Sequence, residues 1–113
     1  MAIGKYKGVL AMQWLWTWKG KFFGFRNNDE LRLQDGTHVA TFRGDEVFDF
    51  QGNYLGEIRS ENRLITKKSS KRKKRSRSSK KIKMVGRVGR VNYVGNVNII
   101  GHVNFPDKDS FGT

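Results

Sequence analysis

Two consecutive 16-residue segments, 29–44 and 45–60, align on each other without a gap. Each copy opens with an acidic pair, continues with apolar residues two apart, and reaches a turn before a second apolar stretch. The turns contain Asp35-Gly36 and Gln51-Gly52-Asn53, and glycine supplies the positive φ that tight hairpin turns require. A repeat of this length has room for one β-hairpin, so we expect an array of short hairpins.

The return strand of each copy carries the pattern apolar, small, any, apolar. It reads VATF at residues 39–42 and LGEI at residues 55–58. A small residue inside a strand has little to pack, which indicates a bulge or the close approach of another segment.

A third copy starts at residues 61–66, and the pattern returns only at residues 85–88 (VGRV). If one strand ends at Thr66 and its partner starts at Met84, the residues between them form an insertion at a hairpin tip. Such an insertion is tolerated because each doubling of loop length costs only about 0.6 kcal/mol.

Apolar residues recur at every third position from residue 85 to residue 103, with Gly89, Gly95 and Gly101 six apart. A β-solenoid needs three or more coils, and this stretch has the length of about one. At every second position its apolar residues also share one strand face, so we predict a strand pair that closes the sheet. Residues 106–113 are expected to form a mobile tail.

The hairpin repeat, with return strands at 39–42, 55–58 and 85–88, resembles the bacterial proteins described as four-fold β-flowers. Their short hairpins surround a pseudo-symmetry axis. The resemblance covers residues 14–66 and 82–105, and the Lys/Arg insertion departs from it. It implies a fold without an established activity, so no functional residues are carried over. The prediction is one all-β domain over residues 1–113, with four to five hairpins and a long disordered basic loop at one hairpin tip.

Residues 67–83 form that basic loop, with 11 of the 23 Lys and Arg residues and no acid. The rest of the chain has 12 basic and 10 acidic residues, so it is nearly neutral. Clustered cations repel one another, which favours an extended, disordered segment. The candidate binding residues are Lys67, Lys68, Lys71, Arg72, Lys73, Lys74, Arg75, Arg77, Lys80, Lys81 and Lys83.

Such a loop binds polyanions by releasing their counterions, without reading sequence. We therefore predict a non-enzymatic module that binds a polyanion, with nucleic acid favoured. The loop has no aromatic residue, which argues against base stacking within it. The alternatives are an anionic lipid surface, or an incidental loop on a β-scaffold whose surface binds a protein partner.

Three tryptophans alternate along the first predicted strand, at Trp14, Trp16 and Trp18, and so share one face. They are either core residues or a platform on which bases or sugars stack. Arg87 and Arg90 either extend the cationic surface or simply face solvent.

Catalytic and metal-binding patterns are not found in the sequence. The acids at repeated positions, such as Asp29 and Asp45, fit turns. His38 and His102 stand alone, and there is no cysteine. We therefore expect no enzyme activity, cofactor, metal or small-molecule substrate.

The N-terminal stretch superficially mimics a signal peptide, because Lys5 and Lys7 precede an apolar run. Gln13 and Thr17 interrupt that run and no small-residue cleavage site follows it. No stretch approaches the length of a transmembrane span, so a cytoplasmic location is predicted.

Overall fold

Three hairpins of the same plan follow one another along the chain in the computed structural model, which describes residues 12–111. The strands are β1 (Met12–Thr17), β2 (Phe22–Asn27), β3 (Glu30–Leu33), β4 (His38–Arg43), β5 (Glu46–Phe48) and β6 (Tyr54–Arg59). Each strand pairs with the next in antiparallel fashion. The predicted hairpin repeat is confirmed. Residues 1–11, including Lys5 and Lys7 of the signal-like stretch, lie outside the described residues.

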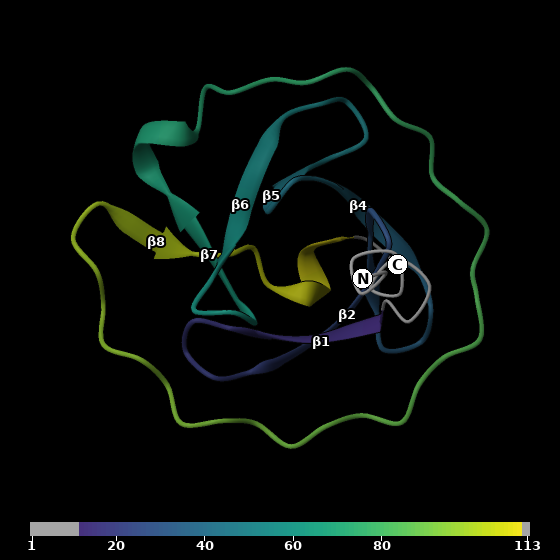
Figure 1. Ribbon diagram of the computed structural model, residues 1–113, viewed down its shortest axis with the longest axis horizontal. Coiled ribbons are helices and arrows are strands. Elements are labelled where there is room, and N and C mark those ends of the chain that lie inside the picture. The colour runs from purple at the N-terminus through teal and green to yellow at the C-terminus, as the bar shows by residue number, and fades with distance from the viewer. Residues whose placement is uncertain (1–11, 112–113) are drawn as a thin grey trace, which may run out of the picture.

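Strand β7 (Arg63–Lys67) closes the sheet into a barrel (Figure 1). It pairs antiparallel with β6, while its first two residues pair in parallel with Trp16 and Thr17 of β1. Its second half pairs with the short strand β8 (His102–Asn104). Within the described residues the fold is therefore a closed seven-stranded barrel with an eighth strand on β7, and the all-β prediction is confirmed.

A β-bulge lies in the second strand of each of the first three hairpins. The register shifts opposite Phe23, Val39 and Leu55, immediately before the small residue of the strand pattern. At Gly56 an added Cβ would lie 2.4 Å from the ring of Phe105. The small residues therefore mark both a bulge and, at Gly56, the close approach of a distant side chain.

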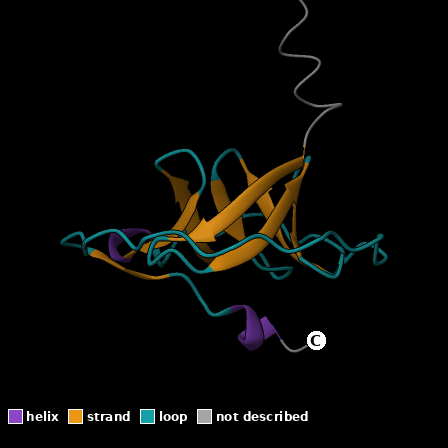
Figure 2. Ribbon diagram, turned by 90° about the horizontal axis from the view of Figure 1, so that it is seen from below, coloured by secondary structure: helices purple, strands orange, loops and turns teal. Residues whose placement is uncertain are grey.

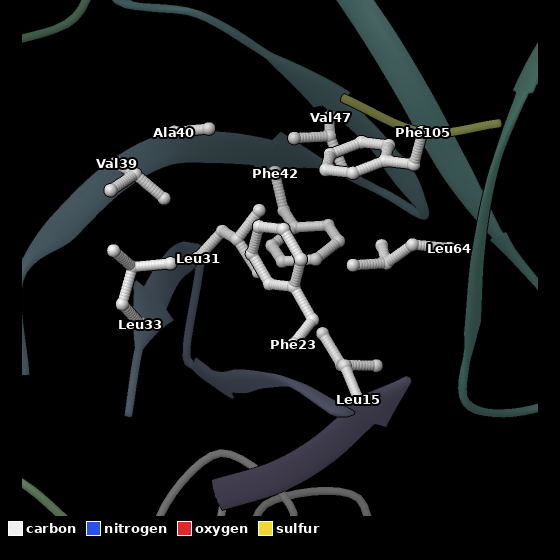
Figure 3. Close-up of a cluster of buried hydrophobic side chains, with 10 residues drawn as sticks. All are labelled: Leu15, Phe23, Leu31, Leu33, Val39, Ala40, Phe42, Val47, Leu64 and Phe105. Atoms are coloured by element: carbon white, nitrogen blue, oxygen red, sulfur yellow. The ribbon is translucent and has the colours of Figure 1, made fainter. Parts of the chain in front are cut away.

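The barrel interior is filled by apolar side chains from β1 to β5, β7 and the segment after β8 (Figure 3). These are Leu15, Phe23, Leu31, Leu33, Val39, Ala40, Phe42, Val47, Leu64 and Phe105. Each fully buried large apolar side chain contributes about 1.5–3 kcal/mol of transfer free energy. Leu15 belongs to this cluster, whereas its neighbours Trp14 and Trp16 lie on the outer side of the strand.

The C-terminal segment returns to this core. Phe105 and Phe111 both meet Phe23 edge-on, with ring centroids 5.4 Å and 5.9 Å away. Phe111 ends the 3-10 helix η2 (Lys108–Phe111), which lies beyond one end of the barrel in Figure 2. The mobility of residues 106–113 stays a prediction.

The predicted strand pair within residues 85–103 is wrong. The partner of β7 is β8, so the predicted partner strand starting at Met84 is wrong as well, and the return pattern at 85–88 is not a strand. The insertion in the β7–β8 hairpin instead runs from the 3-10 helix η1 (Lys68–Ser70) to Gly101. A strand face repeats every two residues, whereas this stretch repeats its apolar residues every three. No helix among residues 12–111 has the length and apolarity to cross a membrane.

Candidate functional site

The inserted residues 68–101, here called the belt, run around the outside of the barrel (Figure 1). Figure 2 shows the belt as a nearly flat ring across the barrel axis. At roughly 3.3 Å per extended residue, 34 residues span about 112 Å, the circumference of a circle about 36 Å across. The molecule measures 37 × 36 Å in its two longest directions. The belt therefore encircles the barrel in nearly extended form, with little slack.

The belt is hydrogen-bonded to the tips of the first three hairpins at intervals of nine residues. The amides of Arg75, Met84 and Tyr93 donate to the carbonyl oxygens of Gly52, Gly36 and Gly20, at 2.8, 3.2 and 2.7 Å. Three residues further on, the amides of Ser78, Arg87 and Asn96 donate to the carbonyl oxygens of Phe50, Gln34 and Trp18. A nine-residue spacing in the belt therefore matches the 16-residue spacing of the hairpins.

Glycine is needed at these three tips for two reasons. Gly20, Gly36 and Gly52 have φ angles of +94°, +93° and +93°, which side-chain-bearing residues rarely adopt. A Cβ at any of them would also lie 1.9–2.1 Å from a belt carbonyl oxygen. Each tip glycine therefore adopts the φ angle that the turn requires and lets the belt backbone approach closely.

Several belt residues that are separated by multiples of three positions face the barrel. The Arg75 guanidinium lies over the Phe48 ring, that of Arg90 over Trp14, and Tyr93 stacks on Trp16 with centroids 3.9 Å apart. The opposite side carries an outward apolar row whose side chains are 80–99% exposed. The row consists of Ile82, Val85, Val88, Val91, Val94, Val97 and Ile100.

The eleven basic residues predicted as the binding site follow one another from the end of β7 along the first part of the belt. All eleven are exposed. Lys73 and Arg75 reach the carboxylate of Glu46, and Lys83 lies 3.6 Å from Asp35. Within residues 12–111 the other eight make no ion pair; they are Lys67, Lys68, Lys71, Arg72, Lys74, Arg77, Lys80 and Lys81. The structure thus spreads the predicted residues along the first part of the belt, where they form an excess of exposed positive charge, here called the basic arc.

Backbone groups and the side chains of His38, Thr41 and Ser78 hold the basic arc to the barrel. The Lys73 carbonyl accepts from the Tyr54 amide, and the Lys81 amide donates to Nδ1 of His38 at 2.8 Å. The Ser78 hydroxyl meets the Thr41 hydroxyl at 2.9 Å. Anchoring therefore leaves most cationic groups exposed to solvent. Disorder of the loop stays a prediction.

Arg32 is a buried anchor that the sequence analysis did not identify. Its side chain is 4% exposed and pairs with Glu30 at 2.7 Å. It also donates to the carbonyl oxygens of Gly36 at 2.7 Å and Ile82 at 3.0 Å. Burial raises the pKa of Glu30, but hydrogen bonds from Arg32 and Asn27 outweigh this and hold that pKa below its usual value. One guanidinium therefore joins a hairpin tip to the belt.

His38 is a second anchor, also buried. Its Nε2 lies 2.8 Å from the Ala40 carbonyl oxygen, and its Nδ1 accepts from Lys81. These contacts fit a neutral ring that carries its proton on Nε2. Burial lowers the pKa of His38, and the nearby Arg32 charge lowers it further. His38 is thus held neutral and positions the basic arc.

The tryptophan stripe lies under the belt. Trp16 and Trp18 are buried, and their indole nitrogens donate to the carbonyl oxygens of Val91 and Val97 at 2.9 and 2.7 Å. Trp14 is half-buried. Two of the three indoles therefore pack between barrel and belt, while Trp14 keeps contact with solvent.

No group of three or more acidic or histidine side chains that could hold a metal ion occurs in the described part of the chain. Comparisons with protein-family models, with curated proteins and with solved structures each give no match. The proposals below therefore rest on the geometry of this chain.

Proposed function

We propose that the protein is a non-enzymatic, cytoplasmic module that binds a polyanion through the basic arc, and that the polyanion is nucleic acid. The observation that carries this proposal is the set of eight exposed cations that lack an ion-pair partner within residues 12–111. Their backbone is attached to a closed barrel, so binding need not order a free loop.

The expected mode of binding is electrostatic. Lys74, Arg77 and Lys80 follow at three-residue intervals, which corresponds to about 10 Å of extended chain. Phosphates neutralised along such a row release condensed counterions, which gives salt-sensitive affinity without base readout. This curved, exposed row of cations suits a sugar-phosphate backbone that runs along the rim of the barrel.

A charge-neutralised variant tests the proposal. Lys74, Arg77, Lys80 and Lys81 are changed together to Gln, and the control variant changes Lys19, Lys21, Arg43 and Arg59, which are also exposed. Both variants lose four positive charges. Binding of a labelled DNA duplex and of an RNA is followed by fluorescence anisotropy at several salt concentrations.

The unmodified protein should bind with a steep salt dependence. The arc variant should lose about 3–4 units of the slope of log K against log salt, at about 0.9 per phosphate contact. The control should lose less. A flat salt response of the unmodified protein, or equal losses in the two variants, would contradict the proposal. Substitution is preferred to shortening, because the belt has little slack.

We also infer that the barrel is a form of the four-fold β-flower. The β7–β8 pair is then the fourth hairpin, with the belt as its enlarged tip. Joining Lys67 to His102 through an Asn-Gly turn should preserve the β-sheet signal in circular dichroism, because the core cluster contains no belt residue. Loss of all sheet signal would contradict this inference.

A protein-interaction scaffold is the second candidate function. The outward apolar row favours it, because seven exposed valine and isoleucine side chains on one side of the belt offer apolar surface to a partner. Sedimentation velocity of the unmodified protein and the arc variant tests this function. Equal self-association of both would favour the scaffold, whereas a strictly monomeric protein without a partner would count against it.

A further inference from the structure

A groove opens on the outer surface of the barrel where the belt crosses β1. Its volume is about 480 Å³, within the range of roughly 300–1,000 Å³ that is typical of small-ligand sites. It is lined by Trp14, Trp16, Gly89, Arg90, Val91 and Tyr93. The groove lies outside the basic arc, so the function proposed above does not explain it.

The aromatic lining of this groove is held in place. Tyr93 stacks on Trp16 with an interplanar angle of 13°, and the Trp16 indole nitrogen donates to the Val91 carbonyl. Trp14 meets Phe22 and Phe25 at centroid distances of 5.9 and 6.2 Å. The guanidinium of Arg63 lies over the Tyr93 ring at 5.3 Å, as that of Arg90 lies over the Trp14 ring. A planar ligand would therefore meet the exposed parts of these rings and the guanidinium planes beside them, which need little further ordering, and this lowers the entropic cost of binding.

Arg90 brings a positive charge to the groove. Its guanidinium lies 4.5 Å from the centroid of the Trp14 ring, which holds the side chain by a cation–π contact. Among residues 12–111 it makes no ion pair and no side-chain hydrogen bond, so its N–H donors remain available for an anionic oxygen. Gly89 has no side chain, and a Cβ there would lie 2.8 Å from the Gln34 amide oxygen.

We propose that this groove binds an unpaired nucleobase, with Arg90 donating to the neighbouring phosphate, so that the preferred polyanion is single-stranded nucleic acid. Aromatic rings and guanidinium planes are the surfaces on which splayed bases stack. A base inside a duplex has its faces covered by its neighbours and must leave the stack before it can enter such a site. This inference rests on the proposed polyanion binding, which supplies the charge along the rest of the strand.

The part of the belt between the basic arc and the groove also carries positive charge. From Lys83 to Arg90 the belt advances seven residues, or at most about 23 Å. Arg87 lies between them with its guanidinium 5.6 Å from the Phe25 ring centroid. A single strand that follows the belt therefore meets positive charge from the basic arc to the groove.

The test compares a ligand that has bases with one that has none. Labelled oligo(dT) is titrated in one arm, and inorganic polyphosphate competes with it or is titrated alone in the other. The variants are Trp14→Leu, Trp14→Phe and Arg90→Gln, with Arg87→Gln as the charge-matched control. Circular dichroism and thermal unfolding confirm that each variant is folded.

Trp14→Leu should weaken oligo(dT) binding about 5- to 150-fold, the range that one stacked base supplies. Arg90→Gln should also weaken it, because the neighbouring phosphate loses its donor. Trp14→Phe should retain most of the binding, and Arg87→Gln should weaken it less than Arg90→Gln. Polyphosphate affinity should be unchanged in the Trp14 variants. Oligo(dT) should also quench tryptophan emission, whereas polyphosphate should not.

Two outcomes overturn the inference and can be told apart. If Trp14→Leu and Arg90→Gln leave oligo(dT) binding intact while the basic-arc variant abolishes it, the groove takes no base and the polyanion function stands. If neither oligo(dT) nor polyphosphate binds the unmodified protein, the proposed function fails together with this inference. If Trp14→Leu does not fold, the tryptophan emission of the unmodified protein decides the question, because a bound base should quench it and polyphosphate should not.

Discussion

The barrel and the belt are built on opposite uses of apolar residues. In the barrel, apolar side chains face inward and contribute ten members to the core cluster. In the belt, the apolar row faces outward, and its members are at least 80% exposed. The barrel is therefore stabilised by burial, whereas the belt is held by backbone hydrogen bonds, aromatic stacking and buried polar anchors.

This difference shows that apolar periodicity alone does not reveal which side chains are buried. A strand buries alternate residues because its neighbours fix both of its faces. The belt has the barrel on one side only, and its inward positions are occupied by residues such as Arg75, Arg90 and Tyr93. Its valines are left to face solvent.

The largest expected effect comes from truncating one apolar side chain in each of the two regions. Leu31→Ala, inside the barrel, should lower the free energy of unfolding by about 2–5 kcal/mol through lost burial and a cavity. Val88→Ala, on the outward row, should change it by about 0.5 kcal/mol or less. Urea unfolding measures both. A loss above 1 kcal/mol for Val88→Ala would mean that the row is packed against another surface.

A second comparison uses two glycines that both have positive φ. Gly44 has φ +65° with no atom near an added Cβ, whereas Gly36 faces the belt at Met84. Gly44→Ala should lower the free energy of unfolding by about 1–2 kcal/mol, the penalty for a residue with a Cβ in the left-handed conformation. Gly36→Ala should cost more and should expose residues near Met84 to trypsin. Equal costs with unchanged proteolysis would mean that the belt does not rest on this tip.

The pH dependence of stability should report the His38 anchor. Because burial lowers its folded pKa below the ordinary value of 6.5, the unfolded chain binds more protons between those two values. The contribution of His38 to the free energy of unfolding should therefore be fully present above about pH 6.5. It should be lost as the pH falls from there toward the folded pKa. Thermal unfolding of the unmodified protein and of His38→Gln measures this. An identical slope in both would contradict the role of His38.

The smallest effect is expected at an exposed ion pair. Lys83 and Asp35 are both more than half exposed and lie 3.6 Å apart. Lys83→Ala should change the free energy of unfolding by about 0–1 kcal/mol, the range for surface pairs. The same variant should still weaken polyanion binding in the anisotropy titration. A larger loss of stability would assign Lys83 to the anchors of the belt.

The hairpin array was predictable because its signals are local. Turn glycines, alternating apolar residues and a gapless repeat each constrain a few neighbouring residues. The exposure of the basic residues was predictable for a similar reason, since clustered cations are rarely buried. The placement of the insertion in one hairpin was also correct, although its length was not.

The path of the belt was not predicted. It depends on a match between the nine-residue spacing of the belt contacts and the 16-residue spacing of the hairpins, which lie far apart in the sequence. A signal exists in the sequences MVGR at 84–87 and YVGN at 93–96, which are nine residues apart. The buried anchors have a signal as well. Arg32 stands at the repeat position of Trp16 and Phe48, and His38 at that of Phe22 and Tyr54. A polar residue at an otherwise aromatic repeat position indicates a specific polar partner, but only the fold shows which one.

The order of the belt contacts has a consequence for synthesis. All strands of the barrel proper lie before residue 68, so they leave the ribosome before any belt residue does. The belt then meets the hairpin tips in reverse order, at Arg75, then Met84, then Tyr93. Phe105, the last member of the core cluster along the chain, leaves the ribosome after every belt residue. During synthesis the seven barrel strands are therefore available for pairing before the belt and the last core side chain are.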